Sequence, residues 1–140
     1  MKIVIAGAGE VGSHLAKLLS YENQDIVLVD RDASKLAAID ANYNLMTMVG
    51  SPTSFNALRE AGVEDCDLFI AVTPYESTNV ISCSIAKQIG AGRTVARIDN
   101  YEFMINTLVE GHIEEDVVCD KNRKDVCAVL YFFARTFLFV

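Results

Sequence analysis

The chain has 140 residues, a net charge of −7, and 51% apolar residues against 22% charged ones. Its length indicates one domain with a single hydrophobic core, and its apolar content excludes a disordered chain. The acidic balance argues against a protein that binds nucleic acid through phosphate contacts, since the densest basic run, at 121–124, is short.

The four cysteines lack C-x-x-C spacing and the two histidines lie far from them in sequence, so we expect no metal site. Reduced thiols that act as small core residues indicate a reducing compartment. No apolar run reaches the roughly 20 residues that cross a bilayer. The N-terminal residues also lack the pattern of a signal peptide. We therefore expect a cytoplasmic protein with no direct insertion into the membrane.

Short β-branched runs alternate with longer helical patterns, which is typical of βαβ units with a parallel sheet. In chain order we expect a strand at 3–6, a helix at 11–20, a strand at 26–29, a helix capped by Asp32, a strand at 45–49, a short helix ending at Gly62, a strand at 68–72, a long helix ending at Gly90, a strand at 94–98, a helix at 101–109 and a strand at 117–118. The fold class is therefore α/β: a single-domain, Rossmann-like doubly wound sheet in the order 3-2-1-4-5-6.

Ligands of such sheets bind in a crevice beyond the carboxyl ends of the strands. This rule places five segments around one crevice: 7–12, 30–32, 50–53, 73–79 and 97–100. For the core, we expect the inner stripe of the first helix to include Leu18 and that of the long helix to include Ile81. We also expect four large side chains to be buried: Met46, Met48, Phe55 and Phe69.

A glycine-rich motif, Gly7-Ala8-Gly9-Glu10-Val11-Gly12, lies between the first expected strand and the first expected helix. In a G-x-G-x-x-G motif the first glycine permits a tight turn and the second lets the backbone approach a pyrophosphate. The third lets the helix pack closely, and the helix N-terminus faces the phosphates. The motif alone is a weak signal, but the strand, the helix and an acidic residue 18 positions after Gly12 strengthen it. The sequence therefore favours nucleotide binding over a purely structural glycine turn.

Asp30, at the end of the second strand, is the acidic residue of this pattern. Its carboxylate can accept hydrogen bonds from a ribose diol and would repel a 2′-phosphate, which favours NAD over NADP. Arg31 weakens that preference, although strand alternation would turn it to the opposite face if the strand continued beyond Asp30. The alternative is that Asp30 only helps to cap the second helix.

Polar residues at the ends of the fourth and fifth strands complete the candidate site. Thr73 could bind a phosphate or ribose, or simply begin the following helix. Glu76 and Asn79 lie one helical turn apart and could face the same site, or be solvated residues of the first turn. Arg97 interrupts an apolar strand, which suggests that it meets an anion, although an exposed arginine at the sheet edge is the alternative.

The chain shows no catalytic constellation. His14 and His112 have no evident partner, and we find no nucleophile–base pair. We therefore expect no enzymatic activity. The rival hypotheses are the cofactor-binding half of an NAD-dependent dehydrogenase, and an NAD-bound redox repressor that should carry a basic DNA-binding module.

Taken together, these motifs resemble the nucleotide-binding regulatory domains of potassium transport systems, called KTN or RCK domains, and most closely those of TrkA type. The resemblance covers residues 1 to about 120 and rests on a series of segments: the glycine loop, Val29-Asp30-Arg31-Asp32, Val49-Gly50, Leu68-Phe69-Ile70-Ala71-Val72-Thr73, Asn79 with Ala86-Lys87, Ala96-Arg97-Ile98, and Glu102-Phe103. It implies a cytoplasmic sensor that binds NAD, NADH or the adenine nucleotides ATP, ADP and AMP, and that controls a membrane potassium channel or transporter.

The resemblance also implies roles for single residues. Gly7, Gly9 and Gly12 would hold the phosphates, Asp30 the ribose, and Arg97 would lie near the ligand phosphates. The segment at Gly50 and Ser51 would lie near the adenosine. The family usually has Asp where this chain has Ser51, and its D-E-x-N motif reads Glu76-Ser77-Thr78-Asn79 here, with one acid lost.

We divide the chain into a nucleotide-binding domain at 1–120 and a C-terminal apolar helix at 121–140. The final residues have no polar face, so a single domain could not bury them alone. We expect at least a homodimer, with Phe132, Phe133 and Phe137 at or near the contact. The alternative is that this helix packs on its own sheet.

Overall fold

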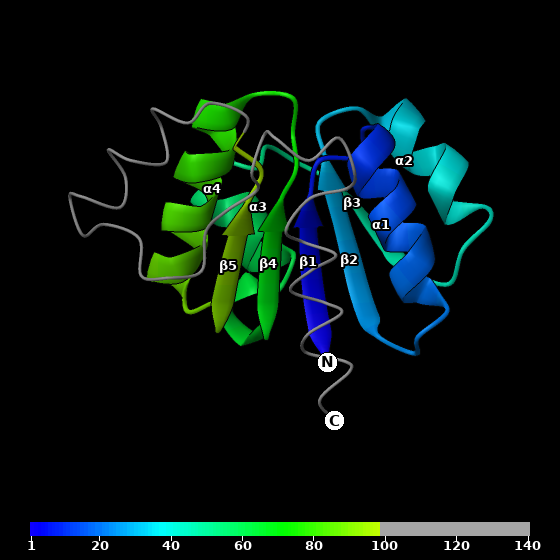
Figure 1. The fold of residues 1–140 in the computed structure, drawn as a ribbon, viewed down its shortest axis with the longest axis horizontal. Helices are drawn as coiled ribbons and strands as arrows, with labels where there is room; N and C mark the ends of the chain where they lie inside the picture. The colour runs from blue at the N-terminus through cyan, green and yellow to red at the C-terminus, as the bar shows by residue number, and fades with distance from the viewer. Residues whose placement is uncertain (99–140) are drawn as a thin grey trace.

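The computed structural model describes residues 1–98, in which all the strands belong to one parallel sheet (Figure 1). The strands are β1 (Lys2–Ala6), β2 (Asp25–Asp30), β3 (Met46–Val49), β4 (Leu68–Ala71) and β5 (Arg93–Ala96). Their order, β3-β2-β1-β4-β5, confirms the first five positions of the predicted sheet. The expected helix at 101–109, the strand at 117–118 and the helix at 121–140 lie outside the described residues.

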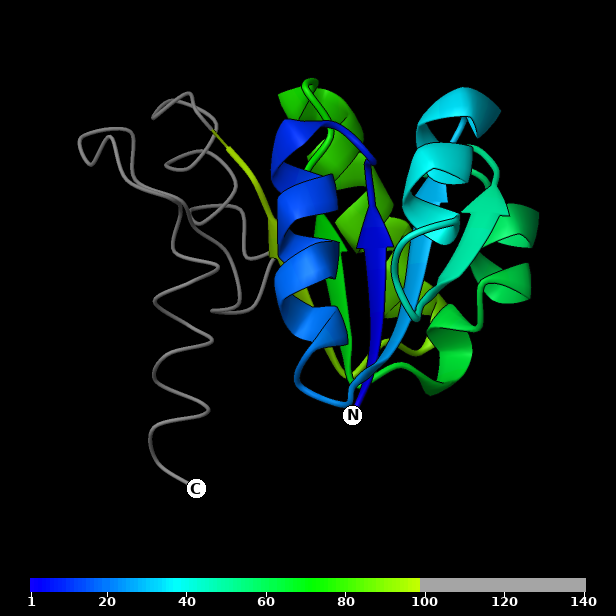
Figure 2. The ribbon, with the colours of Figure 1, turned by 90° about the vertical axis from the view of Figure 1, so that its right-hand side faces the viewer.

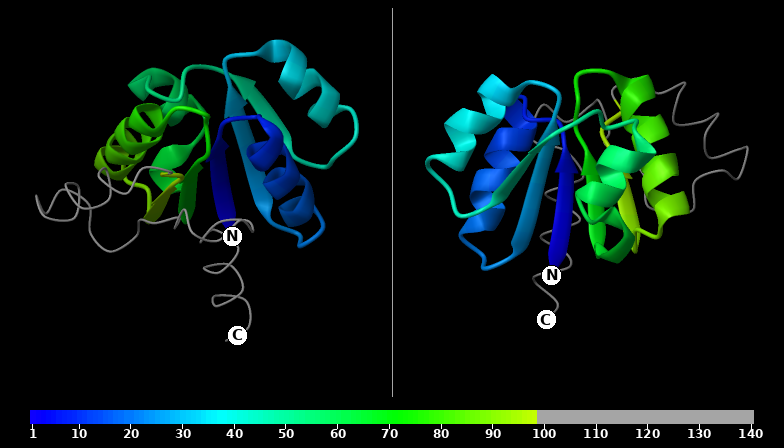
Figure 3. Two further views of the ribbon diagram at one scale, coloured as in Figure 1. Left: turned by 45° about the horizontal axis from the view of Figure 1, so that its top comes forward. Right: turned by 180° about the vertical axis from the view of Figure 1, so that it is seen from behind.

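Helices cover both faces of this sheet, as the views in Figures 2 and 3 show. The helices are α1 (Glu10–Ser20), α2 (Ala33–Asp40), α3 (Phe55–Glu60) and α4 (Glu76–Ile89), with a 3₁₀ turn, η1, at Val63–Asp65. α1 and α2 pack on one face, while α3, η1 and α4 pack on the other. No helix among residues 1–98 is long and apolar enough to cross a membrane.

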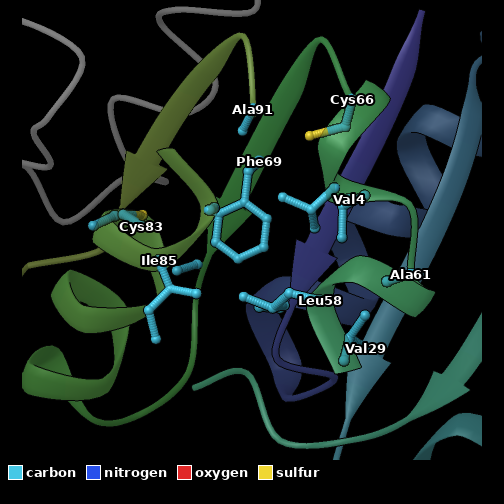
Figure 4. Close-up of a cluster of buried hydrophobic side chains, with 14 of the residues drawn as sticks. Val4, Val29, Leu58, Ala61, Cys66, Phe69, Cys83, Ile85 and Ala91 are labelled. Atoms are coloured by element: carbon cyan, nitrogen blue, oxygen red, sulfur yellow. The ribbon is translucent and has the colours of Figure 1, made fainter. Parts of the chain in front are cut away.

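Two hydrophobic clusters, one on each face, hold the sheet between the helices. Phe69 of β4 is fully buried in the second cluster, where Figure 4 shows it among Val4, Leu58 and Ile85. Alternation along a strand sends neighbouring residues to opposite faces, so a strand covered on both sides is apolar throughout. This accounts for the continuous apolar run of β4, whose four residues are all buried.

The cysteines of the described residues lie in the same second cluster. Cys66 and Cys83 are free thiols and are buried, which confirms the expectation that they act as small core residues. Burial raises the pKa of Cys66 to about 11 and that of Cys83 to about 12. Both thiols are therefore protonated and weakly nucleophilic at neutral pH.

The structure corrects four of the core predictions. Met46, Phe55, Leu18 and Ile81 are exposed, Met46 by 64%. Met46 lies on β3, which pairs with β2 alone among the strands of residues 1–98 and has no fully buried residue. Leu18 falls outside the buried stripe of α1, which is formed by Gly12, Leu15, Ala16 and Leu19. Ile81 likewise misses the buried face of α4. Phe69 is buried as predicted, and Met48 is half-buried.

Local signals for the helix ends agree with the structure. The Asp32 side chain caps α2 by accepting from the Ser34 amide at 2.9 Å. Gly62 and Gly90 follow α3 and α4 with positive φ angles of 77° and 128°, a conformation that glycine adopts at little cost. The observed strand ends differ from the predicted ones by one or two residues. For example, β5 ends at Ala96, whereas the predicted strand ends at 98.

Candidate nucleotide-binding site

The candidate segments follow the carboxyl ends of the five strands and therefore lie along one edge of the sheet, although only 97–98 of the last segment belong to the described residues. The register pairs Ala6 of β1 with Val29 of β2 and with Ala71 of β4, and Ala71 with Ala96 of β5. Because these partners are level across the sheet, the glycine loop lies between the end of β2 and the end of β4. This is the edge of the sheet at which the sequence predicts that a ligand binds.

Gly7 makes the tight turn that leaves β1. Its φ of 112° is unfavourable for other residues, and its amide donates to the Val29 carbonyl at 2.8 Å. A Cβ at Gly7 would lie 2.9 Å from the Thr73 nitrogen. Only glycine fits where the loop passes this close to the end of β4.

The other two glycines of the motif have opposite surroundings. A Cβ at Gly12 would overlap the Gly7 carbonyl oxygen and lie 3.2 Å from the Val72 side chain. Among residues 1–98, no atom lies within 4 Å of a Cβ built at Gly9. Gly12 is therefore needed for close packing of α1 on the loop and on Val72, which follows β4. The described part of the chain gives no packing reason for a glycine at position 9.

Gly9 is also the N-cap residue of α1 and has no side chain with which to cap the helix. α2 and α3 are capped by Asp32 and Ser54, whose side chains accept from backbone amides. The first amides of an α-helix lack intrahelical acceptors and carry the positive end of the helix dipole. The open space at Gly9 thus adjoins donors that suit an anionic group such as a phosphate.

The intervening residues of the motif differ in what they can offer. The Glu10 side chain is exposed in the first turn of α1, whereas the Val11 side chain packs against the first hydrophobic cluster. Val11 can therefore contribute only its backbone to a ligand. The Ala8 amide donates to a carboxylate oxygen, Oδ2, of Asp30 at 2.7 Å and is engaged within the protein.

Asp30 lies beside the glycine loop, as predicted, and its carboxylate ties the loop to the end of β2. Oδ2 accepts from the Ala8 amide, and Oδ1 accepts from the Asp32 amide at 2.8 Å. The N-cap residue of α2 is Asp32, and Asp30 supports the start of this helix by accepting from the Asp32 amide, in addition to its bond with the glycine loop. A carboxylate has about four acceptor positions, so two bonds leave capacity for a ribose hydroxyl.

The end of β3 lies at one end of this carboxyl edge of the sheet, beside the end of β2. The Gly50 amide donates to the Asp30 carbonyl at 2.9 Å, and a guanidinium nitrogen, Nη2, of Arg31 donates to the Ser51 hydroxyl at 2.8 Å. β2 ends at Asp30, so strand alternation does not extend to Arg31. The condition under which the sequence turns Arg31 to the opposite face is therefore not met, and its side chain bonds to Ser51 after β3.

Thr73 and Asn79 form a closed hydrogen-bond network where β4 meets α4. The Asn79 carbonyl oxygen, Oδ1, accepts from the Thr73 amide at 2.9 Å and from the Thr73 hydroxyl at 2.7 Å. The Asn79 amide nitrogen, Nδ2, donates to the Thr73 carbonyl at 3.0 Å and to the Arg97 carbonyl at 2.9 Å. Asn79 is 1% exposed, so it faces the junction of β4 and β5 and not solvent.

The remaining two candidates lie at the same edge. Glu76 is half-buried in the first turn of α4, where the sequence places it. Arg97 follows β5, and its amide donates to the Ala71 carbonyl at 2.8 Å, which keeps its main chain level with the end of β4. The sequence reasoning missed the internal bonds of Asp30 and Asn79. The only available signal was that Asn79 falls on the same helical stripe as Cys83 and Ala86.

A comparison with protein families identifies a match over most of the chain. The model of a family described as TrkA-N domain matches residues 3–119. The Trk system potassium uptake protein TrkA homolog of Archaeoglobus fulgidus is 38% identical over 112 residues, which are 80% of this chain and 25% of that protein. The TrkA protein of Haemophilus influenzae is 40% identical over 74% of this chain and 23% of its own length. The chain thus spans about a quarter of the length of these curated relatives.

Solved structures share the fold at lower identity. The Kef CTD of Shewanella denitrificans, in its AMP-bound form, has a TM-score of 0.69 and 19% identity, with coverage of 99% of this chain and 82% of that one. The GsuK channel bound to NAD has a TM-score of 0.69 and 18% identity, with coverage of 84% and 21%. At these identities the likeness establishes the Rossmann-like fold.

Proposed function

Since this chain belongs to the TrkA-N domain family, we propose that it is a nucleotide-binding regulatory domain of a potassium transport system, and that its ligand is NAD or NADH. The relatives are named for potassium uptake and not for a chemical reaction, in line with the expectation of no catalysis. Binding would act by shifting a conformational equilibrium that a transport partner reads.

The observation that carries this proposal is the open space at Gly9. It lies at the start of α1, between the Asp30 carboxylate on the β2 side and Thr73 on the β4 side. A pyrophosphate fits this position because it is anionic and needs close approach to backbone amides. A structural turn would not require glycine at position 9, where the φ of −73° suits any residue.

The two sides of this space suit the two ends of a dinucleotide. Asp30 retains acceptor capacity for an adenosine ribose, and its charge disfavours a 2′-phosphate, so we propose NAD over NADP. The bound nucleotides of the two solved relatives, AMP in one and NAD in the other, are compatible with such a site. ATP, ADP and AMP are the alternative ligands, since they share the adenosine and the phosphate.

The test is the variant Gly9→Val, which places a side chain in the proposed pyrophosphate position. Because no atom of residues 1–98 lies within 4 Å of a Cβ there, the fold should persist while NADH binding is lost. Isothermal calorimetry measures the affinity and thermal unfolding checks the fold. Ala37→Val, at an exposed position of α2, is a matched control that should bind normally. A folded Gly9→Val protein with near-wild-type affinity would refute this site.

Assembly and location belong to the same proposal. We propose at least a homodimer that lies in the cytoplasm and attaches to the inner face of the membrane through a potassium channel or transporter subunit. The apolar residues at 121–140 support the dimer because a single domain exposing them would be unusual. Sedimentation at tens of micromolar tests it, and a monomer that does not aggregate would contradict it. Steady-state hydride transfer with simple hydroxy acids would instead favour the dehydrogenase alternative.

A further inference from the structure

The carboxyl edge of the sheet has two halves that differ in their polar groups: one at the ends of β1 and β2, and one at the ends of β4 and β5. The order β3-β2-β1-β4-β5 puts the glycine loop at the centre, with Asp30 on the β2 side and Thr73 and Arg97 on the β4–β5 side. A mononucleotide with its phosphate on the glycine loop and its ribose at Asp30 occupies only the β1–β2 half. A dinucleotide that shares this anchoring must continue over β4 and β5.

The β4–β5 half is held together by the side chain of Asn79. This residue is 1% exposed, and its four hydrogen-bonding positions are all used: two by Thr73 groups that donate and two by the carbonyls of Thr73 and Arg97. The amide group thus joins the start of α4 to the ends of two neighbouring strands. A buried amide so placed cannot contact a ligand itself.

We infer that Asn79 is a positioning residue, which sets the main chain at Thr73 and Arg97 for the part of a dinucleotide that lies beyond the glycine loop. The inference rests on the proposed nucleotide site. β4 ends at Ala71 and β5 at Ala96, so Thr73 and Arg97 themselves lie outside the regular strands. The Arg97 amide continues the pairing of the two strands by donating to the Ala71 carbonyl. The Asn79 side chain adds a second link between the two strand ends, because its amide nitrogen donates to the carbonyls of Thr73 and Arg97.

The Thr73 end of the network also touches the glycine loop. A Cβ at Gly7 would lie 2.9 Å from the Thr73 nitrogen, the same atom that donates to Asn79. A shift of Thr73 would therefore change the spacing between the glycine loop and the end of β4. The adenosine side, which depends on Asp30 and the Ala8 amide, has no bond to Asn79 and should stay in place.

The test compares two ligands in the 140-residue chain: NADH, which spans both halves, and AMP, which needs only one. Asn79→Ala removes all four bonds, and Asn79→Asp keeps the acceptor oxygen but replaces the donor NH₂ that faces two carbonyls. We expect the affinity for NADH to fall on the order of tenfold, as for the loss of a net hydrogen bond, and the affinity for AMP to change less than about twofold. A loss of NADH affinity without an equal loss of AMP affinity distinguishes a positioning role of Asn79 from a general loss of folding stability, which would weaken the binding of both ligands.

Ser82→Ala is the matched control. Ser82 is fully buried on the same helix, but its hydroxyl donates to the Thr78 carbonyl within α4 and not to the strand ends. It should leave both affinities unchanged. Amide hydrogen exchange gives a readout that needs no ligand: exchange at Thr73 should accelerate in Asn79→Ala and not in Ser82→Ala.

Each outcome bears on one claim. If the wild-type chain binds neither NADH nor AMP, the proposed function fails, while faster exchange at Thr73 in Asn79→Ala still supports the link that we assign to Asn79. If the wild type binds both, equal losses for the two ligands in Asn79→Ala, or no loss for either, overturn the inference. A selective loss of NADH binding in Ser82→Ala would also overturn it. If Asn79→Ala does not fold, the comparison is made with Asn79→Asp.

Discussion

The starts of α1 and α4 lie at the same edge of the sheet and are built in opposite ways. Neither helix is capped by the side chain of its N-cap residue, Gly9 or Tyr75. At α1 the space around position 9 is open, and the nearby carboxylate of Asp30 keeps acceptor capacity. At α4 a buried side chain, Asn79, satisfies the polar groups of Thr73 from within the protein. One strand–helix junction is thus suited to receive a ligand, and the other is suited to hold its shape.

This contrast shows why polar residues at the end of a strand do not by themselves identify ligand contacts. Thr73 and Asn79 have the composition of a binding segment, yet their polar atoms bond mainly to each other. Burial explains the difference, because a polar group removed from water must find a partner and the nearest partners are backbone groups. The β1–β2 half has glycine at the start of its helix instead, and glycine brings no polar side chain that would need a hydrogen-bond partner.

The largest loss of folding stability should come from Gly12→Ala, which disturbs the packing of α1 on the glycine loop of the β1–β2 half. The new Cβ would overlap the Gly7 carbonyl oxygen, a backbone atom that cannot move without displacing the turn. Overpacking of this kind costs about 1–3 kcal/mol, and more where backbone is involved, so we expect a loss near or above the upper value. Urea unfolding measures it. Gly9→Ala is the control and should change stability by less than about 1 kcal/mol. Equal stability of the two variants would contradict the packing role of Gly12.

An effect of intermediate size, on NADH affinity, is expected from Asp30→Asn. This variant tests whether the β1–β2 half binds the ribose. The variant keeps one acceptor oxygen but loses the charge and the second acceptor that now serve the Ala8 and Asp32 amides. We expect NADH affinity to fall by about 1–3 kcal/mol, the range for hydrogen bonds to charged groups. The preference for NADH over NADPH should narrow, because the repulsion of a 2′-phosphate is removed. Calorimetry with both ligands checks this, and an unchanged ratio would argue against contact with the ribose.

The effect that is smallest at neutral pH concerns the β4–β5 half, because it appears only above pH 9. Cys83 lies one turn after Asn79 on the buried face of α4, and burial raises its pKa to about 12 from an ordinary value of 9.0. Above pH 9 the unfolded chain loses this proton while the folded chain keeps it. Stability should therefore be intact below pH 9 and fall as the pH rises from 9 toward 12, by at most about 1.4 kcal/mol per pH unit for one thiol.

The measurement is the free energy of unfolding between pH 9 and 11, in the wild type and in Cys83→Ala. The slope against pH should be shallower in the variant, even though its overall stability is lower because a small cavity forms. Parallel slopes would show that Cys83 titrates normally in the folded protein. Iodoacetamide labelling of the Cys83 peptide at pH 8, followed by mass spectrometry, should be slow in the native protein and fast in denaturant.

The sequence by itself determined the order of the elements, the parallel α/β class and the glycine loop. These features depend on local chemistry: apolar runs for strands covered on both faces, glycine where a turn needs positive φ, and caps such as Asp32 at helix starts. Asp30 could be identified in the same way, because its distance from the glycine motif is a property of one βαβ unit.

Only the tertiary structure decided which side chains are covered and which polar groups are already bonded. Met46 is an apolar residue of the kind found in cores, but β3 is an edge strand of the sheet that residues 1–98 form, and this side chain is exposed. Asn79 has the composition of a ligand contact, but its partners, the carbonyls of Thr73 and Arg97, come together only when β4 and β5 pair. Contacts between residues far apart in sequence depend on the packing of the whole sheet, and no local pattern encodes them.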